Sequence, residues 1–311
     1  MGELRAADLG VVLPVLPVDK TFEPAYGTAV EVAPGIRRIV AKNANAFTFH
    51  GTGTYVVGRG QVAVIDPGPL LDEHVDAILT ALKGESISHI LVTHTHSDHS
   101  PAAAPLKQAT GARTYAYGPH GRARESGGVD VEEGGDMLFL PDVTLRDGEK
   151  VQVGGLEFEA VYTPGHTSNH LCFALTDGSA VFPGDHVMGW STTVIAPPDG
   201  DMADYFRSLE KLLQRPEAPF YPTHGNPIVK SRNFVRQLIE HRHARELQIL
   251  ACLKTGVVTI PEMVAVIYSE VDRRLHPAAS RSVLAHLQHM VQTGRAACDG
   301  VASPSAPYRA V

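Results

Sequence analysis

The segment Thr93–His99, which reads THTHSDH, constrains the fold of this chain more than any other stretch of its sequence. It directly follows Ile90–Val92, a short and wholly apolar run that is typical of a strand buried on both faces. If the backbone stays extended beyond that strand, His94, His96 and Asp98 project to the same side, because side chains alternate along a strand. Strand ends of this kind are where α/β folds commonly build functional sites.

A helix is expected soon after this segment, with His99 at the turn that leads into it. Ser100 could cap the helix and Pro101 could occupy its first position. Pro105 would interrupt the helix, so its start is left open. Together with the three preceding donors, His99 gives four metal-binding groups within six residues.

Three later segments each place one metal-binding side chain after a strand-like run and beside a glycine. They are Pro164-Gly165-His166, Pro183-Gly184-Asp185 and Thr223-His224-Gly225. With the first segment they supply five His and two Asp, enough for two cations bridged by one carboxylate. Nitrogen and oxygen donors without thiolate favour zinc, and iron or manganese is also compatible. The alternative is a helix-capping Asp among ordinary surface histidines.

Composition excludes several other classes of protein. The 16 His contrast with 3 Cys, and those cysteines are far apart, so neither a disulfide framework nor a thiolate zinc cage is predicted. We find no apolar run of the roughly 18 residues that span a bilayer, and no basic leader, which favours a soluble, unprocessed, cytoplasmic protein without membrane contact. A net charge of −7 argues against a surface devoted to nucleic acid, although a local basic patch stays open.

The first part of the chain, residues 1–227, is predicted to be a mixed α/β domain that contains the metal-binding segments. Short β-rich runs alternate there with helical spacing. The expected strands are Thr54–Val57 and Gln61–Ile65, forming a hairpin, then Ile90–Val92, Leu156–Val161, His170–Leu175 and Ala180–Phe182. The expected helices are Leu70–Lys83 and Asp201–Leu213, and Gly118–Pro141 is expected to be a long loop.

Residues 228–311 are predicted to form a helical, winged-helix-like domain. A long helix is expected over Ser231–Leu253, and the Thr259-to-Glu262 spacing of a capping box predicts the start of a second. A third helix, Pro277–Thr293, has one apolar face and stops at Gly294. The segment Arg295–Val301 could then form a β wing.

The order of these donors resembles the metallo-β-lactamase superfamily, whose hallmark is His-x-His-x-Asp-His followed by a His, an Asp and a last His. The resemblance implies an αββα sandwich with the metals at one edge, between the sheets. It implies that His94, His96 and His166 hold the first metal. It assigns Asp98, His99 and His224 to the second metal, and Asp185 to the bridge. Asp66, in Val64-Ile65-Asp66-Pro67-Gly68, matches an early Asp that orients a site histidine in this family.

Departures from the family's branches narrow the comparison. Class B1 β-lactamases place a Cys where this chain has Asp185, and flavodiiron proteins place a carboxylate where it has His96. What remains resembles the binuclear hydrolases, which include glyoxalase II-like thioesterases, lactonases and ribonucleases. The segments Gly184–Trp190 and Thr192–Val194, with His241-Arg242 and Arg245–Leu250, are similar to the β-lactamase-like protein 2 group, which includes an endoribonuclease acting on single-stranded RNA.

Such a centre predicts hydrolysis by a hydroxide that bridges two zinc ions roughly 3.5–4 Å apart. Asp98 would orient the water and take its proton, while Asp185 bridges the metals. The same apparatus serves a phosphodiester, a thioester and a lactone, so single-stranded RNA and a small ester or thioester both stay open as substrates. A nucleic-acid-binding module with a structural metal is a further alternative, and a homo-oligomer is compatible with the sequence.

Three regions are candidates for substrate recognition. The loop Val187–Asp199 could wall the pocket through Met188 and Trp190, or these could be plain core contacts. The loop Gly118–Pro141 carries His120, Arg122 and Arg124, which could contact a phosphate or carboxylate, or be exposed loop charges. Between residues 231 and 300, nine Lys and Arg stand against six Asp and Glu, a balance that suits a phosphate backbone, but packing on the hydrolase core explains it equally well.

The remaining histidines are interpreted as mainly structural. His170 is expected to support the site from behind the ligands, and His186 could assist the neighbouring Asp185. The other eight have no constellation of donors around them in the sequence; they are His50, His74, His89, His241, His243, His276, His286 and His289.

Overall fold

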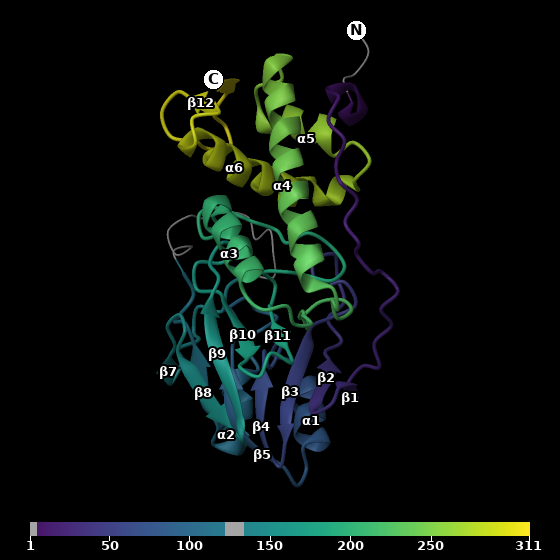
Figure 1. Ribbon diagram of the computed structural model, residues 1–311, viewed down its shortest axis with the longest axis vertical. Helices are drawn as coiled ribbons and strands as arrows, with labels where there is room; N and C mark the ends of the chain where they lie inside the picture. Colours follow the sequence, from purple (N-terminus) through teal and green to yellow (C-terminus); the bar gives the residue numbers. More distant parts are fainter. Residues whose placement is uncertain (1–4, 122–133) are drawn as a thin grey trace.

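The computed structural model describes residues 5–121 and 134–311. Two β-sheets face each other in the lower half of Figure 1, and the C-terminal helices stand at the opposite end of the molecule. The larger sheet contains, in order, β1 (Val30–Ala33), β2 (Ile36–Val40), β3 (Gly53–Arg59), β4 (Gln61–Ile65), β5 (Ser86–Leu91), β6 (Arg113–Ala116) and β7 (Val143–Thr144). The smaller sheet contains β11 (Val181–Phe182), β10 (Leu171–Leu175), β9 (Leu156–Tyr162) and β8 (Lys150–Val153).

The larger sheet has apolar side chains on both of its faces, so one face packs on the smaller sheet and the other on helices. In β3, Tyr55 and Val57 face the smaller sheet, whereas Val56 packs on the other side with Ile78 of helix α1 (Asp72–Ala81). Both faces of the strand are therefore apolar, and the sheet is buried on both sides. Helix α2 (Ala103–Thr110) covers the same outer face as α1.

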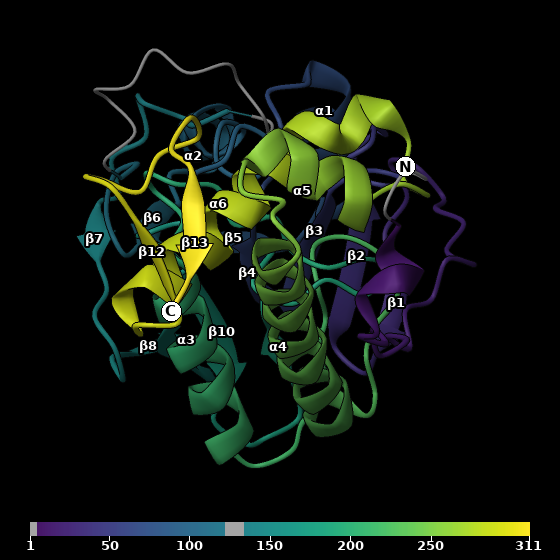
Figure 2. The ribbon, with the colours of Figure 1, turned by 90° about the horizontal axis from the view of Figure 1, so that it is seen from above.

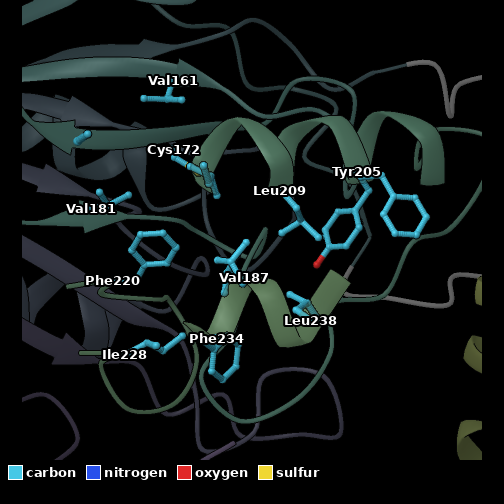
Figure 3. Packing of buried hydrophobic residues seen from close by; sticks show 14 of the residues in the cluster. Val161, Cys172, Val181, Val187, Tyr205, Leu209, Phe220, Ile228, Phe234 and Leu238 are labelled. Atoms are coloured by element: carbon cyan, nitrogen blue, oxygen red, sulfur yellow. The ribbon is translucent and has the colours of Figure 1, made fainter. Parts of the chain in front are cut away.

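The outer face of the smaller sheet is covered by two helices. They are α3 (Met202–Gln214), whose N-cap Asp201 accepts a hydrogen bond from the Asp204 backbone, and α4 (Ser231–Lys254). Figure 3 shows Tyr205 and Leu209 of α3 directed toward Val187 and Leu238. The layers are thus helix, sheet, sheet, helix, which confirms the predicted αββα sandwich.

A second core lies beyond the sandwich, at the far end of α4. It is built from α4, α5 (Ile260–Ile267), α6 (His276–Gln292) and the hairpin of β12 (Ala296–Cys298) with β13 (Tyr308–Ala310). The short helices η1 (Ala6–Leu9) and η3 (Arg273–Leu275) flank it. Figure 2 shows α5 and α6 beside α4, with β12 and β13 on the side of α6. The helices and hairpin confirm the predicted winged-helix-like domain.

Helix α4 joins the two parts of the molecule. Phe234 and Leu238 belong to the core of the sandwich, whereas Ile249 and Cys252 belong to the C-terminal core. With 24 residues at 1.5 Å each, the helix is about 36 Å long, enough to span both. The domain boundary between residues 227 and 228 stays a prediction, because the helix that follows it contributes to both cores.

Three local expectations were wrong. The chain is not extended through Asp98: it turns after His96, whose carbonyl accepts a hydrogen bond from the backbone N–H of His99. Ser100 does not cap a helix, because α2 begins at Ala103 and the Ser100 hydroxyl donates to Asp136 instead. The wing takes its second strand from Tyr308–Ala310, not from the run ending at residue 301.

Candidate metal centre and active-site pocket

Four loops bring the donors together at one edge of the sandwich, below the C-terminal domain. They follow β5, β9, β11 and the bridge at Phe220, and each contributes the side chains predicted for it. Ligand atoms come within 4.8 Å of one another in three sets: His94, His96 and His166; His94, His99 and Asp185; and Asp98, His99 and His224. All seven side chains are buried.

Two glycines allow their loops to approach the site. Gly165 and Gly184, which precede His166 and Asp185, have φ values of 136° and 52°, and a Cβ on Gly165 would lie 2.4 Å from the Tyr205 backbone. A side chain at either position would therefore push a donor loop away from its neighbours. Close packing of the loops therefore explains why a glycine precedes both His166 and Asp185.

The first donor set consists of three neutral imidazoles. Nε2 of His94 and Nε2 of His166 lie 3.0 and 3.1 Å from Nδ1 of His96. Burial, followed by repulsion among the rings, lowers the pKa of His94 and His96 well below the usual value. Uncharged ring nitrogens that converge in this way present the lone pairs that zinc and similar cations require.

The second donor set is Asp98, His99 and His224, and the carboxylate of Asp185 lies beside it. Nε2 of His224 lies 3.2 Å from Oδ2 of Asp98 and 3.3 Å from Oδ2 of Asp185, and Nε2 of His99 lies 3.5 Å from Oδ1 of Asp185. Burial alone would lower the pKa of His224, but Asp185 and Asp98 outweigh it and raise that pKa to about 10. Burial likewise favours neutral Asp98, yet His99 and His224 lower its pKa to about 2. Asp185 approaches both donor sets, as a bridging ligand would.

The far nitrogen of several donor rings is held by an oxygen. His99 donates from Nδ1 to Oδ2 of Asp66 at 3.0 Å, and His166 from Nδ1 to the carbonyl of Val194 at 2.8 Å. His224 donates from Nδ1 to the carbonyl of Gly51 at 3.2 Å. Each contact holds the proton on Nδ1, so that Nε2 is the nitrogen that faces the site and would bind a cation on losing any proton it carries. The geometry of Asp66 is that of the orienting role expected for it.

Buried polar atoms without partners test whether a cation fits. Among the described residues, Nε2 of His99 and Oδ1 of Asp185 are buried and have no geometrically acceptable hydrogen bond. Leaving such atoms unpaired costs free energy, and a cation between them would satisfy both. The donors present therefore fit metal ions, and two cations would be held by His94, His96 and His166 and by Asp98, His99 and His224, with Asp185 shared.

The two supporting histidines lie on the same side of the site. The ring of His170 lies 5.1 Å from that of His94, and its Nδ1 lies 2.9 Å from the Thr163 hydroxyl. His186 is fully buried against Tyr205, with ring centroids 4.6 Å apart. Within the described chain neither ring nitrogen of His186 has a hydrogen-bond partner. His186 therefore forms no hydrogen bond with Asp185.

A cavity of about 340 Å³ opens directly above the metal-binding side chains. Its walls come from both parts of the molecule. Met188 and Trp190 line it as predicted, and the C-terminal domain adds apolar side chains; its further lining includes Phe47, Ile267, Tyr268, Val271, Leu275 and Ala278. Arg122 and Arg124 lie outside the described residues, whereas Nδ1 of His120 lies 2.9 Å from the Thr95 hydroxyl.

Several residues of the site have no counterpart in the sequence predictions. Thr52 donates to Oδ2 of Asp98 at 2.8 Å, and Phe49, at a positive φ of 59°, stacks on Trp190 at 4.7 Å between ring centroids. Arg242 and Arg245 of α4 also line the cavity. In the sequence, only Gly51 and Gly53, which flank Thr52, could have drawn attention to that loop.

The expectation that eight histidines have no constellation was wrong for three of them. His243, His286 and His289 surround the buried carboxylate of Glu246, with Nδ1 of His289 2.7 Å from Oε1. Arg295 donates to the other oxygen at 2.6 Å. His241, moreover, lines the active-site cavity. The Glu246 cluster ties α4 to α6 and to the start of the wing.

This arrangement of sandwich, donor loops and appended helices defines a class of protein, and comparison with known families agrees. Residues 48–224 match the model of the metallo-beta-lactamase superfamily, and residues 259–301 match the beta-lactamase associated winged helix domain. The chain therefore belongs to the metallo-beta-lactamase superfamily and is a metal-dependent hydrolase. In the described ranges, no helix has both the length and the apolar character needed to cross a bilayer.

Particular relatives extend over most of the chain. The beta-lactamase-like protein 2 homolog of Drosophila melanogaster is 31% identical over 83% of this chain and 88% of its own length. An atrochrysone carboxyl ACP thioesterase of Claviceps purpurea is 28% identical over 79% of this chain and 76% of its own length. A beta-lactamase domain protein from Burkholderia ambifaria has the same fold, with a TM-score of 0.76 at 21% identity, covering 94% of this chain and 96% of its own.

Proposed function

We propose that this protein is a binuclear zinc hydrolase that cleaves a small ester or thioester with an apolar acyl group. One observation carries the proposal: the two donor sets lie at the floor of a cavity whose lining is mostly apolar. A volume of about 340 Å³ lies in the range of about 300–1,000 Å³ that is usual for small-molecule sites.

Two cations held by these side chains would supply Lewis-acid polarisation of a carbonyl group and a water acidic enough to ionise near neutrality. The chain's own residues supply the rest. Asp98 is ionised at neutral pH and is held by the Thr52 hydroxyl, so it can orient a water and accept its proton. Met188, Trp190 and Tyr268 line the cavity, and a substrate seated against them would displace water and strengthen the electrostatic interactions around the scissile bond.

Two further observations support an acyl substrate. The relative from Claviceps purpurea is named as a thioesterase. The C-terminal domain contributes Ile267, Val271 and Leu275 to the cavity, and these side chains suit an acyl chain better than a ribose-phosphate backbone. Ile267 ends α5 and Leu275 ends η3, so the segment that joins these two helices lines the cavity.

Single-stranded RNA is the alternative that the sequence resemblance raises. It would require an open, basic path for the strand. The net charge of −7 and the predominance of apolar side chains in the cavity lining do not favour it. The same hydrolytic centre would nevertheless serve a phosphodiester, so RNA belongs in the test.

The test is a side-by-side assay of zinc-loaded protein on an aliphatic acyl thioester, an acyl lactone and single-stranded RNA. We expect saturable hydrolysis of the thioester or lactone, and its loss in Asp185→Asn. Asp201→Asn is the matched control, because Asn caps α3 as well as Asp does and lies outside the donor set. Cleavage of RNA with steep salt dependence and no turnover of either acyl compound would overturn the proposal.

A further inference from the structure

Two buried arginines line the active-site cavity. Arg242 and Arg245 lie three residues apart on α4 and are only 4% and 8% exposed. In the described part of the chain neither forms an ion pair with a carboxylate. Arg295, by contrast, pairs with Glu246, and Arg215 with Glu159, at 2.6 and 2.7 Å.

Arg242 is linked to the loop that carries Asp185 through Thr193. It donates to the carbonyl of Thr193, whose hydroxyl donates to the carbonyl of Asp185 at 2.6 Å. Its guanidinium lies 5.2 Å from the centre of the Tyr205 ring. Its Nε is buried and has no hydrogen-bond partner within the described chain. Arg242 therefore holds the loop that carries the bridging carboxylate and keeps one donor unused.

Arg245 lies further along α4, about 4.5 Å away at 1.5 Å per residue. One arm donates to Oε1 of Gln248 at 2.7 Å, and the guanidinium lies 4.3 Å from the centre of the Tyr268 ring. Gln248 and Tyr268 offer an amide oxygen and an aromatic ring, not a carboxylate, so they orient the arginine without forming an ion pair with it. The guanidinium keeps N–H donors for a ligand in the cavity.

A buried charge without a counter-ion is costly, and two neighbouring cations add repulsion. Burial and then Arg242 lower the pKa of Arg245, although an arginine stays charged under all ordinary conditions. Such an arrangement is unfavourable for stability alone. It is favourable when an anionic ligand completes it, because an arginine fork binds a carboxylate or phosphate through paired, charge-assisted hydrogen bonds.

We propose that Arg245, supported by Arg242, binds an oxyanion on the substrate, so that the preferred ester or thioester carries a carboxylate or phosphate away from the scissile bond. The identification of the bound anion as part of the substrate rests on the proposed function. The anion site itself is a property of the cavity. Apolar walls between Trp190 and Tyr268 would hold the carbon chain, and the arginines its charged end.

The chain's single tryptophan, Trp190, lines the cavity and gives a direct binding signal. Its fluorescence is followed while the metal-loaded full chain is titrated with heptanoate, hexyl phosphate or uncharged heptan-1-ol. We expect at least one of the two anions to bind more tightly than the alcohol. Arg245→Met should lower the ratio of anion to alcohol affinity by about 10- to 100-fold. The anion that shows the larger loss identifies carboxylate or phosphate as the natural group.

Arg236→Met is the matched control, because Arg236 is exposed on the same helix, and it should leave the ratio within about twofold. Arg245→Gln repeats the test with a polar side chain in case the methionine variant folds poorly. An unchanged affinity ratio in folded Arg245 variants overturns the inference, even if thioesters are hydrolysed. Arginine-dependent anion binding with no thioester or lactone turnover supports the anion site and instead refutes the proposed function.

Discussion

Replacing Asp66 with Asn should weaken metal binding without disturbing the fold. The buried carboxylate accepts four hydrogen bonds: from the backbone N–H and the hydroxyl of Thr93, each at 2.7 Å, from His99 at 3.0 Å and from Thr223 at 3.2 Å. Asn has nearly the same shape. It also tolerates the left-handed backbone at this position, where φ is 48°.

The substitution changes one oxygen acceptor into an NH₂ donor. If the amide oxygen keeps the Thr93 backbone N–H, the NH₂ group faces Nδ1 of His99. The imidazole must then accept there and carry its proton on Nε2, the nitrogen that faces Asp98 and Asp185. A protonated Nε2 cannot bind a metal.

Loss of an orienting partner of this kind typically lowers metal affinity by about 10- to 100-fold, equivalent to about 1.4–2.7 kcal/mol. The assay is a competition titration of zinc between the protein and a chromophoric chelator, from which the affinities of both sites are obtained. Asp201→Asn serves again as the control. Zinc affinity of Asp66→Asn equal to that of the wild type at both sites would refute the reasoning.

Three further predictions concern catalysis and stability. Asp98→Asn should lower kcat by about 10²–10⁴-fold, measured on the best acyl substrate, because the amide cannot accept a proton. Leu238→Ala should lower the free energy of unfolding by about 2–5 kcal/mol in urea denaturation, since this side chain is 1% exposed where α4 packs on α3. Burial lowers the pKa of His74 to about 4 from 6.5, so the unfolded chain binds the proton first and stability should fall between pH 6.5 and 4, by at most roughly 3 kcal/mol. His74→Gln should reduce that loss.

The donor set could be predicted from the sequence because its information is local. His166, Asp185 and His224 each stand beside a glycine after a strand-like run, and parallel or neighbouring strands end at a common edge. The spacing of the residues did not by itself show that the donors divide into two sets, because the turn after His96 moves Asp98 away from His94. That turn depends on contacts with residues 134 and 135, far along the chain.

The remaining features depend on helix packing that no single segment reveals. Glu246 with His243, and His286 with His289, each have the spacing of an ordinary helix face, and only the crossing of α4 and α6 brings them together. Arg245 was likewise counted among the nine basic residues between residues 231 and 300, with no place in the site assigned to it. It is the docking of the C-terminal domain over the donor loops that buries it in the cavity.

The most direct test of the account is the dependence of hydrolysis on metal content. Protein stripped with a chelator is titrated with zinc, and acyl thioester turnover is measured beside the metal bound per chain by native mass spectrometry. The account predicts no turnover without metal and a rise that levels off at two bound ions per chain. Full turnover by the protein while no metal ion is bound would contradict it.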